Sequence, residues 1–276
     1  NLPKWIETHV RLPSEVSAQT GPMALTPVQR GIAEAMGDPE IERVSVVKPV
    51  RLGYTSLLTA LVGYYCDSDP SPILAVHPTE SDARGWIVDD VEPIFAASPD
   101  LRGLLTLEAD PTGRSTLLSR KFPGGSLKVI AAKSPRNLRR HNAKVLILDE
   151  IDAMESGAEG SPITLAERRT LSFPDRKIVA GSTPTWEDTS HILRLYAQSD
   201  KRVFEIRCLD CKGYTAPTWQ HIEWESGKPE TAAFTCPLCG AVQPETRKAE
   251  MVNRGRWVKT APEVQNHAGF RANVLV

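Results

Sequence analysis

The sequence lacks long apolar runs: no stretch of its 276 residues approaches the roughly 18 consecutive apolar residues that a membrane-spanning helix requires. The N-terminal run Asn1-Leu2-Pro3-Lys4-Trp5 also lacks the apolar core of a signal peptide. The formal net charge is only -1, so the chain lacks the strongly basic balance that is typical of nucleic-acid binding. We therefore expect a soluble, cytoplasmic protein with no membrane contact, in which any DNA contact is local.

Cysteine is also scarce, because five residues are too few for a disulfide scaffold. Four of them form two CxxC knuckles, Cys208-x-x-Cys211 and Cys236-x-x-Cys239, separated by residues 212–235. Four thiolates in this spacing predict closed tetrahedral coordination of a structural Zn²⁺. Three roles stay open for the knuckles, namely bracing of the fold, contact with DNA or a partner, and an unmetallated state. The fifth cysteine, Cys66, is predicted to be buried packing.

Short β-branched apolar runs alternate with helical segments from residue 43 onward. This pattern predicts an α/β fold with a mostly parallel sheet flanked by helices. The expected central strands cover residues 44–47, 73–77, 145–148 and 178–180. Helices are expected over 27–36, 56–65 and 82–97, the last with Ser81 as a cap and Pro93 as a kink. A hairpin is expected from 115–122 and 126–131, around Pro123-Gly124-Gly125.

Three units follow from the changes of texture along the chain. Residues 1–201 are expected to form a nucleotide-binding domain, whose first 25 residues are an arm that is draped over the surface and not packed. Residues 202–245 are expected to form a small zinc-ribbon-like module. Residues 246–276 are expected to be a return segment or linker toward a further domain.

The segment from Ser45 to Ser56 runs from a strand through a short loop into a helix, where a P-loop belongs. Aligning Gly53 with the last loop glycine puts Thr55 at the magnesium position, but Tyr54 then stands where a lysine is expected. Lys48 and Arg51 lie in the same loop and could supply the positive charge that phosphates need. An ordinary strand-to-helix turn is the alternative interpretation.

Two further strands end in polar side chains. The strand 145–148 ends in Asp149-Glu150, which predicts a magnesium-binding Asp149 and a water-polarising Glu150. The strand 178–180 is followed by Gly181-Ser182-Thr183-Pro184, whose hydroxyls are expected to sense a γ-phosphate. We expect this strand beside the Asp149 strand, and the Gly53 turn on a strand neighbouring the acidic pair. Together these elements predict an ATP-hydrolysing P-loop fold of the RecA/ASCE type.

Taken in this order, the motifs resemble the lambda-type (GpA) family of phage terminase large subunits over nearly the whole chain. The stretches that carry the resemblance are Lys48-Pro49-Val50-Arg51-Leu52-Gly53-Tyr54, Pro78-Thr79-Glu80-Ser81-Asp82-Ala83, Phe122-Pro123-Gly124-Gly125-Ser126, Leu148-Asp149-Glu150, Ala158-Glu159-Gly160-Ser161-Pro162, Gly181-Ser182-Thr183-Pro184 and the paired knuckles.

The resemblance implies an ATPase motor that uses ATP and Mg²⁺ to move double-stranded DNA into a procapsid. It implies that Lys48 or Arg51 is the essential basic residue and that Gln29 contacts the adenine edge. It places a trans-acting arginine near residues 137–141, where Arg139 is the first choice. It also implies a small terminase subunit and a portal protein as partners, a homo-oligomeric ring, and the cytoplasm of an infected bacterial host.

Two other functions remain open on the sequence. A helicase-like DNA remodeller shares the Asp149-Glu150 strand but requires a second motor domain. A zinc-ribbon DNA-binding adaptor with a degenerate nucleotide fold would explain the absent loop lysine. Whole members of the resembling family continue into an RNase H-type nuclease, so we expect no DNA cutting from a chain that stops at Val276.

Overall fold

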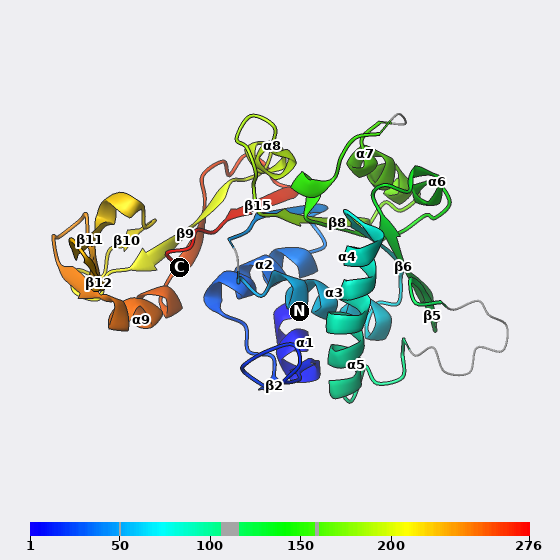
Figure 1. Cartoon of the computed structure of the whole chain (residues 1–276), viewed down its shortest axis with the longest axis horizontal. Coiled ribbons are helices and arrows are strands. Elements are labelled where there is room, and N and C mark those ends of the chain that lie inside the picture. Colours follow the sequence, from blue (N-terminus) through cyan, green and yellow to red (C-terminus); the bar gives the residue numbers. More distant parts are fainter. Residues whose placement is uncertain (50, 106–115, 158–159) are drawn as a thin grey trace.

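The computed structural model describes residues 1–49, 51–105, 116–157 and 160–276. These residues build one ten-stranded sheet, a three-stranded sheet and a short two-stranded ribbon. The strands of the large sheet follow the order β10-β9-β15-β3-β8-β7-β4-β6-β5, and β14 pairs with β9 off this path (Figure 1).

The centre of the large sheet is parallel from β9 to β6 and carries antiparallel strands at its margins. The four strands expected from the sequence are present and confirm the predicted fold class. The parallel strands are β3 (Arg43–Val47), β4 (Pro72–His77), β6 (Gly125–Ala131), β7 (Val145–Asp149), β8 (Lys177–Ser182), β9 (Arg202–Arg207) and β15 (His267–Arg271). The marginal strands are β5 (Ser119–Phe122), β10 (Tyr214–Thr215) and β14 (Arg256–Lys259).

Helices cover both faces of this sheet, and alternate side chains of each strand supply the two cores. One core contains Val46, Ala75 and Ile147 beneath the first group of helices. The other contains Val76, Leu148 and Ala180 beneath the second group. The first group is α1 (Leu2–His9), α2 (Pro27–Gly37), α3 (Tyr54–Asp67), α4 (Glu80–Gly85), the π-helical turn η1 (Trp86–Val91) and α5 (Glu92–Ala97), and the second is α6 (Pro135–Leu138), η2 (Ile151–Ala153), α7 (Pro162–Glu167) and α8 (His191–Ala197). Figure 1 shows the two groups on opposite sides of the strands.

The N-terminal arm is not draped over the surface, which corrects the sequence-based expectation. Asn1 caps α1, and the side chains of Leu2, Trp5 and Ile6 are buried in the first core. The Trp5 indole nitrogen also donates a hydrogen bond to Asp67 at the end of α3 (3.1 Å). The apolar face of α1 therefore anchors the arm, although strands β1 (Arg11–Leu12) and β2 (Gly21–Pro22) that follow it are short.

The helix expected over 82–97 is composite. Thr79, not Ser81, is its cap, because Thr79 and Asp82 form a reciprocal capping box. The turn η1 separates α4 from α5, and Pro93 stands in the first turn of α5. A proline has no N–H to donate, so the wider π-helical turn before it accommodates the break that Pro93 was expected to cause.

The expected hairpin is confirmed within the described residues, which exclude its expected first residue, Ser115. Strands β5 and β6 pair antiparallel through Phe122 and Gly125. The turn between them is Pro123-Gly124, with Gly124 at a φ of 83° that favours glycine.

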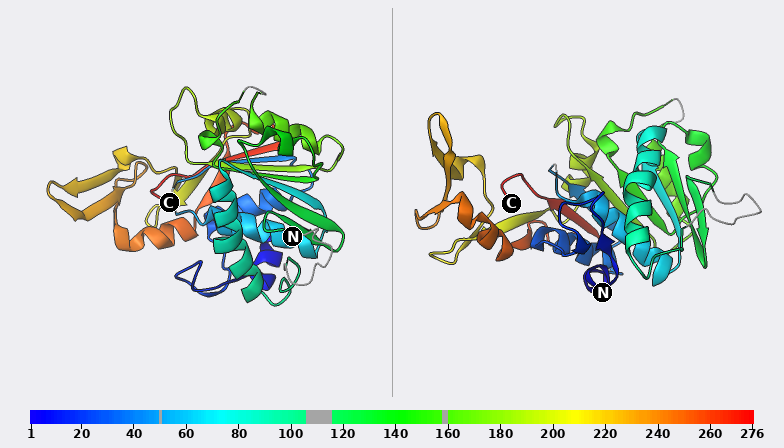
Figure 2. Two further views of the ribbon diagram at one scale, coloured as in Figure 1. Left: turned by 45° about the vertical axis from the view of Figure 1, so that its right-hand side comes forward. Right: turned by 60° about the horizontal axis from the view of Figure 1, so that its bottom comes forward.

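The second part of the chain projects from the end of β9 (Figure 2). Its three-stranded sheet is formed by β11 (Ile222–Glu225), β12 (Lys228–Thr235) and β13 (Val242–Pro244), and helix α9 (Lys248–Asn253) contacts β9. The segment 246–276 then adds β14 and β15 to the large sheet, where β15 lies directly beside β3. In the described residues, no helix is both long and apolar enough to span a bilayer.

Candidate nucleotide site

The predicted site residues converge at one edge of the large sheet. Strands β3, β8 and β7 lie in that order, and their carboxyl ends carry Lys48, Ser182 and Asp149. The strand of Ser182 is beside that of Asp149, as expected. The Gly53 turn and the acidic pair do not come from neighbouring strands, which corrects that expectation, because β8 lies between β3 and β7. Both still face the same edge.

The loop after β3 leads into the N-terminus of α3 through a left-handed turn. Gly53 caps α3 with a φ of 69°, a conformation that glycine adopts at low cost. A side chain at this position would also meet the Gln29 amide nitrogen, 2.6 Å from a Cβ built there. Since no side chain caps α3, its first backbone N–H groups remain available to an anion.

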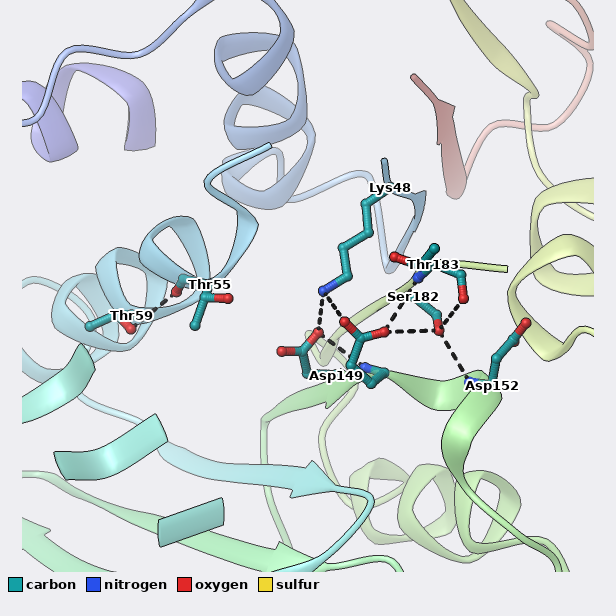
Figure 3. Close-up of polar contacts among 8 residues, drawn as sticks. Lys48, Thr55, Thr59, Asp149, Asp152, Ser182 and Thr183 are labelled. Carbon is teal, nitrogen blue, oxygen red and sulfur yellow. Dashed lines mark hydrogen bonds and ion pairs between the residues drawn. The ribbon is translucent and has the colours of Figure 1, made fainter. Parts of the chain in front are cut away.

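Lys48 bridges the two acidic residues at the centre of the site (Figure 3). Its ammonium nitrogen lies 3.0 Å from Asp149 Oδ1 and 2.8 Å from Glu150 Oε1. The Lys48 and Asp149 side chains are buried, whereas 44% of the Glu150 side chain is exposed. Burial alone would lower the pKa of Lys48, but the two carboxylates outweigh burial and raise it. Lys48 is therefore a charged ammonium held against both carboxylates.

Tyr54 occupies the position where a P-loop lysine is expected, and it is buried under the loop. The Lys48 ammonium lies 4.9 Å from the centre of its ring. The ring also packs on Gly181 of β8, where a Cβ would overlap the ring carbons. Burial, followed by the charges of Asp149 and Glu150, raises the pKa of Tyr54, so its hydroxyl stays neutral. Tyr54 thus supports the loop and leaves the charge to Lys48.

Glu150 stands in a left-handed conformation (φ 52°, ψ 51°), which costs about 1–2 kcal/mol for a residue with a side chain. This turn directs its carboxylate toward the end of β8. Ser182 Oγ donates to Glu150 Oε2 (3.3 Å), and the backbone N–H of Thr183 donates to the same oxygen (3.3 Å). The Asp152 carboxylate in turn accepts hydrogen bonds from the N–H groups of Thr185 (3.1 Å) and Ile192 (2.9 Å). The acidic pair is thereby connected to the loop before α8.

Two cavities open at this edge and meet at Thr55, Asp90 and Glu150. The loop cavity has a volume of about 400 Å³ and is lined further by Lys48, Arg51, Gly53, Tyr54, Ser56 and Thr183. The strand-end cavity has a volume of about 500 Å³ and is lined further by His77, Thr79, Asp82, Trp86, Lys133 and Asp149. A phosphate chain and its metal ion fit the first, because it joins a helix N-terminus to a lysine and carboxylates.

Two predicted residues stand apart from this cluster. Gln29 donates from its amide nitrogen to the Leu52 carbonyl (2.9 Å), and its amide oxygen accepts from the Thr26 N–H (3.0 Å). Gln29 therefore holds the loop in this structure. Arg139 is exposed just after α6 and does not line either cavity. Val50 of the loop and the stretch Ala158-Glu159 lie outside the described residues.

Comparison with known families identifies the chain. Residues 17–257 match the family described as phage terminase large subunit gpA, ATPase domain. The chain belongs to this family. The match covers the loop after β3, the acidic pair, the hydroxyl pair and the four cysteines, so the edge described above is the nucleotide site of a terminase ATPase domain.

Two relatives are large terminase subunits themselves. The terminase large subunit of Escherichia phage lambda is 28% identical over 243 residues, which cover 84% of this chain and 38% of that protein. The terminase large subunit of Enterobacteria phage P21 is 27% identical over 266 residues, which cover 92% of this chain and 41% of that protein. The chain thus spans about two fifths of the length of these relatives.

The crystal structure of the HK97 bacteriophage large terminase has the same fold. It superposes with a TM-score of 0.57 at 16% sequence identity, over 71% of this chain and 40% of that chain.

The four knuckle cysteines of this terminase ATPase domain form one cluster. Their sulfur atoms all lie within 4.8 Å of one another, and the Cys208–Cys239 and Cys211–Cys236 sulfur pairs are each 3.9 Å apart. This separation is far beyond a disulfide bond. It matches the edge of about 3.8 Å that a tetrahedron with Zn–S bonds of about 2.3 Å would have. His221 hydrogen-bonds Thr218 and is not part of the cluster. Cys66 is buried elsewhere, as predicted, and burial raises its pKa.

Sequence reasoning missed His77, Asp90 and Asp152 at this edge. His77 is the last residue of an expected strand, so the argument that selected Asp149 could also have selected it. Asp152 follows the acidic pair by two residues. Asp90 had no such indication, because only the π-helical turn η1 brings its side chain to the cavities.

Proposed function

We propose that Mg²⁺-bound ATP occupies the loop cavity and that its hydrolysis drives double-stranded DNA into a phage procapsid. The observation that carries this proposal is the position of Lys48, which bridges Asp149 and Glu150 beside the uncapped N-terminus of α3. Positive charge, free N–H groups and an acidic pair are the three parts that phosphoryl transfer from ATP requires.

Phosphate binding is assigned to the loop. Lys48 and Arg51 supply positive charge from the early part of the loop, in place of the lysine that Tyr54 replaces. The backbone from Gly53 to Ser56 supplies N–H groups at the start of α3. Gln29 is retained as a proposed contact to the adenine edge, and its hydrogen bond to Leu52 would link adenine binding to the loop.

Magnesium coordination is assigned to Asp149 and Thr55, whose oxygens are ligands of the kind that Mg²⁺ prefers. When bound, Mg²⁺ neutralises the charge of the phosphate oxygens. Lys48 would then exchange its carboxylate partners for a phosphate, because Asp149 is needed by the metal ion. This exchange keeps the buried charges of the site compensated in both states.

Hydrolysis is assigned to Glu150, which would orient a water molecule toward the γ-phosphorus. The water oxygen forms a bond to phosphorus while the bond to the bridging oxygen of ADP breaks, ADP keeps the bonding electrons, and the water proton passes to the Glu150 carboxylate. Ser182 and Thr183 contact the same carboxylate and would sense the loss of the γ-phosphate. Asp152 would carry that change to the loop before α8.

The partners follow from the family and from the relatives. As part of a large terminase subunit, the domain would act on double-stranded DNA in a homo-oligomeric ring, with a small terminase subunit and a portal protein, in the cytoplasm of an infected bacterium. Arg139 is exposed, as an arginine that reaches a neighbouring subunit's site must be. The proposed division into 1–201, 202–245 and 246–276 assigns the motor to the first unit.

The cysteine cluster is proposed to hold one structural Zn²⁺. Burial would raise the pKa of Cys208, but the backbone N–H groups of Cys211 and Asp210 and the neighbouring thiols lower it to about 7, which favours the thiolate that binds metal. Four protein ligands leave no open position for catalysis. The zinc ion would therefore brace the module.

ATP binding and turnover test the proposal. The purified chain should bind ATP with Mg²⁺ and hydrolyse it in the presence of double-stranded DNA. Glu150→Gln should lower turnover by about 10²-fold or more while ATP affinity stays within a few-fold, because the amide keeps the shape but cannot take the proton. Retained turnover in Glu150→Gln would show that another residue is the base.

The same assay separates the two other functions. A zinc-ribbon adaptor with a degenerate nucleotide fold would neither bind nor hydrolyse ATP, and the intact contacts of Lys48 with both carboxylates argue against it. A helicase-like remodeller would separate DNA strands in an ATP-dependent manner, whereas a packaging motor would move along an intact duplex.

A further inference from the structure

His77 presents an unpartnered polar atom to the strand-end cavity. It ends β4, which pairs in parallel with β7 through Val76 and Leu148, so His77 lies one step further along, beside Asp149. Only 4% of the residue is exposed. Its Nε2 atom is buried and has no hydrogen-bond partner among the described residues. Such an atom is costly to bury unless something in the cavity bonds to it.

The ring of His77 is held in place on its other side. It packs against the Trp86 indole, with ring centres 5.0 Å apart. The Trp86 indole nitrogen donates to Thr59 Oγ1 (3.1 Å), and Thr59 Oγ1 donates to the Thr55 carbonyl oxygen (3.1 Å). Through these contacts, the imidazole is fixed relative to the start of α3.

The imidazole is neutral at ordinary pH. Burial lowers the pKa of His77, and the charges of Asp149, Asp82 and Glu150, which oppose this effect, do not overcome it. A neutral imidazole donates a hydrogen bond from one ring nitrogen and accepts one at the other. A water molecule can therefore bond to Nε2 whichever tautomer is present.

The strand-end cavity lies where an attacking water molecule must stand. In-line transfer places the water on the side of the γ-phosphorus opposite to the departing ADP. The loop cavity holds the phosphate-binding groups, and Glu150 lines both cavities, so the space past Glu150 is the strand-end cavity. His77 lines that space together with Asp149, Glu150 and Asp90.

We propose that His77 is a positioning residue for hydrolysis, whose Nε2 atom hydrogen-bonds the water molecule that Glu150 orients. This inference rests on the proposed function. His77 forms and breaks no covalent bond, and the proton of the water still passes to Glu150. Its contribution is to hold the water in line with the bond that breaks, which is a hydrogen bond made fully only in the transition state.

Three variants of the whole chain separate positioning from packing. His77→Phe keeps the stacking on Trp86 but removes the polar atom, and His77→Gln restores an amide near the position of Nε2. The matched control is His267→Phe, because His267 is an equally buried histidine whose Nε2 is bonded to Ser45 (2.8 Å) away from both cavities. Turnover, the KM for ATP and the melting temperature are measured for each variant with Mg²⁺ and double-stranded DNA.

His77→Phe should lower kcat about tenfold, which corresponds to roughly 1.4 kcal/mol, with the KM for ATP within about twofold. His77→Gln should recover most of that loss. The melting temperature of His77→Phe should equal or exceed that of the unsubstituted chain, because an unpartnered buried nitrogen is removed. The control should show the reverse, with normal kcat and a lower melting temperature.

Binding of two analogues provides a readout that does not depend on turnover. The complex of ADP with aluminium fluoride mimics the transition state with its in-line water, whereas ADP with beryllium fluoride mimics bound ATP. His77→Phe should bind the aluminium fluoride complex about tenfold more weakly and the beryllium fluoride complex normally. Should the phenylalanine variant fail to fold, His77→Leu gives the same test.

Equal kcat and equal aluminium fluoride affinity in His77→Phe would overturn the inference and leave His77 as a packing residue. A change confined to the KM for ATP would also overturn it. If Glu150→Gln is inactive while His77→Phe is fully active, the proposed function stands and only the role of His77 falls. Absence of ATP binding by the unsubstituted chain would overturn both.

Discussion

The nucleotide site and the cysteine module are built in opposite ways. The site lies at the end of buried parallel strands whose side chains pack into a core on each face of the sheet. The module has a small core and keeps large apolar side chains exposed, such as Trp219 (64%) and Trp224 (56%). The site should therefore exist before its ligands bind, whereas the module should depend on its metal ion.

Removal of zinc should produce the largest effect and break this comparison if it is wrong. Structural Zn²⁺ binding contributes about 10–16 kcal/mol in small zinc modules. Chelation, or Cys236→Ser, should unfold the module, which proteolysis and the fluorescence of Trp219 and Trp224 would report. The large sheet should stay folded. Cys66→Ala, which lies outside the cluster, should keep one zinc ion per chain, and a module that keeps its protease resistance without metal would contradict the prediction.

Loss of Lys48 should produce the next largest effect, on the other side of the comparison. Lys48→Met removes the charge that neutralises Asp149 and Glu150, and it should weaken ATP binding about 10- to 100-fold, as expected for charged hydrogen bonds of about 1.5–3 kcal/mol. It should also lower the melting temperature without ligand, because two carboxylates lose their shared partner. The matched variant is Arg51→Met, whose exposed side chain should affect ATP binding alone. Equal loss of stability in both variants would contradict the assigned difference.

A glycine under the loop tests how tightly the site is packed. Gly181→Ala would force a methyl group into the ring of Tyr54, which is buried and cannot move aside. We expect a loss of about 1–3 kcal/mol in the free energy of unfolding, measured by urea denaturation. A second substitution, Tyr54→Leu, should offset part of that loss in a double-mutant cycle. Gly157→Ala, where a Cβ meets no atom within 4 Å, should be nearly neutral.

Local sequence patterns predicted the strands and the polar residues that end them. Asp149, Glu150, Ser182 and Thr183 could be placed because each follows an apolar run directly. The order of the strands could not, since β8 enters between β3 and β7 through pairing between residues far apart in the sequence.

Other features were hidden for different physical reasons. The burial of Leu2, Trp5 and Ile6 depends on a groove formed by distant helices, so the N-terminal segment resembled a loose arm. The occupation of Gln29 by Leu52 depends on how the loop folds. Asp90 faces the cavities only because η1 departs from the α-helical period on which sequence patterns rely.

The smallest expected effect concerns Asp90, and it sharpens the statement that the site exists before its ligands. Burial, followed by the charges of Asp89 and Asp149, raises the pKa of Asp90 from 3.8 to about 6. A raised pKa means that the folded state binds this proton more tightly than the unfolded state, so the stabilisation is present below pH 3.8 and is lost as the pH rises through about 6. Asp90→Asn should therefore melt at a higher temperature than the unsubstituted chain at pH 8 without Mg²⁺, and the gain should shrink toward pH 4. Asp89→Asn, at an exposed neighbour, should give a smaller gain, because it only relieves Asp90 of one nearby charge. A gain that is the same at every pH would mean that the Asp90 carboxylate is not held among the charges of the site, and the site would then be less preorganised than its packing suggests.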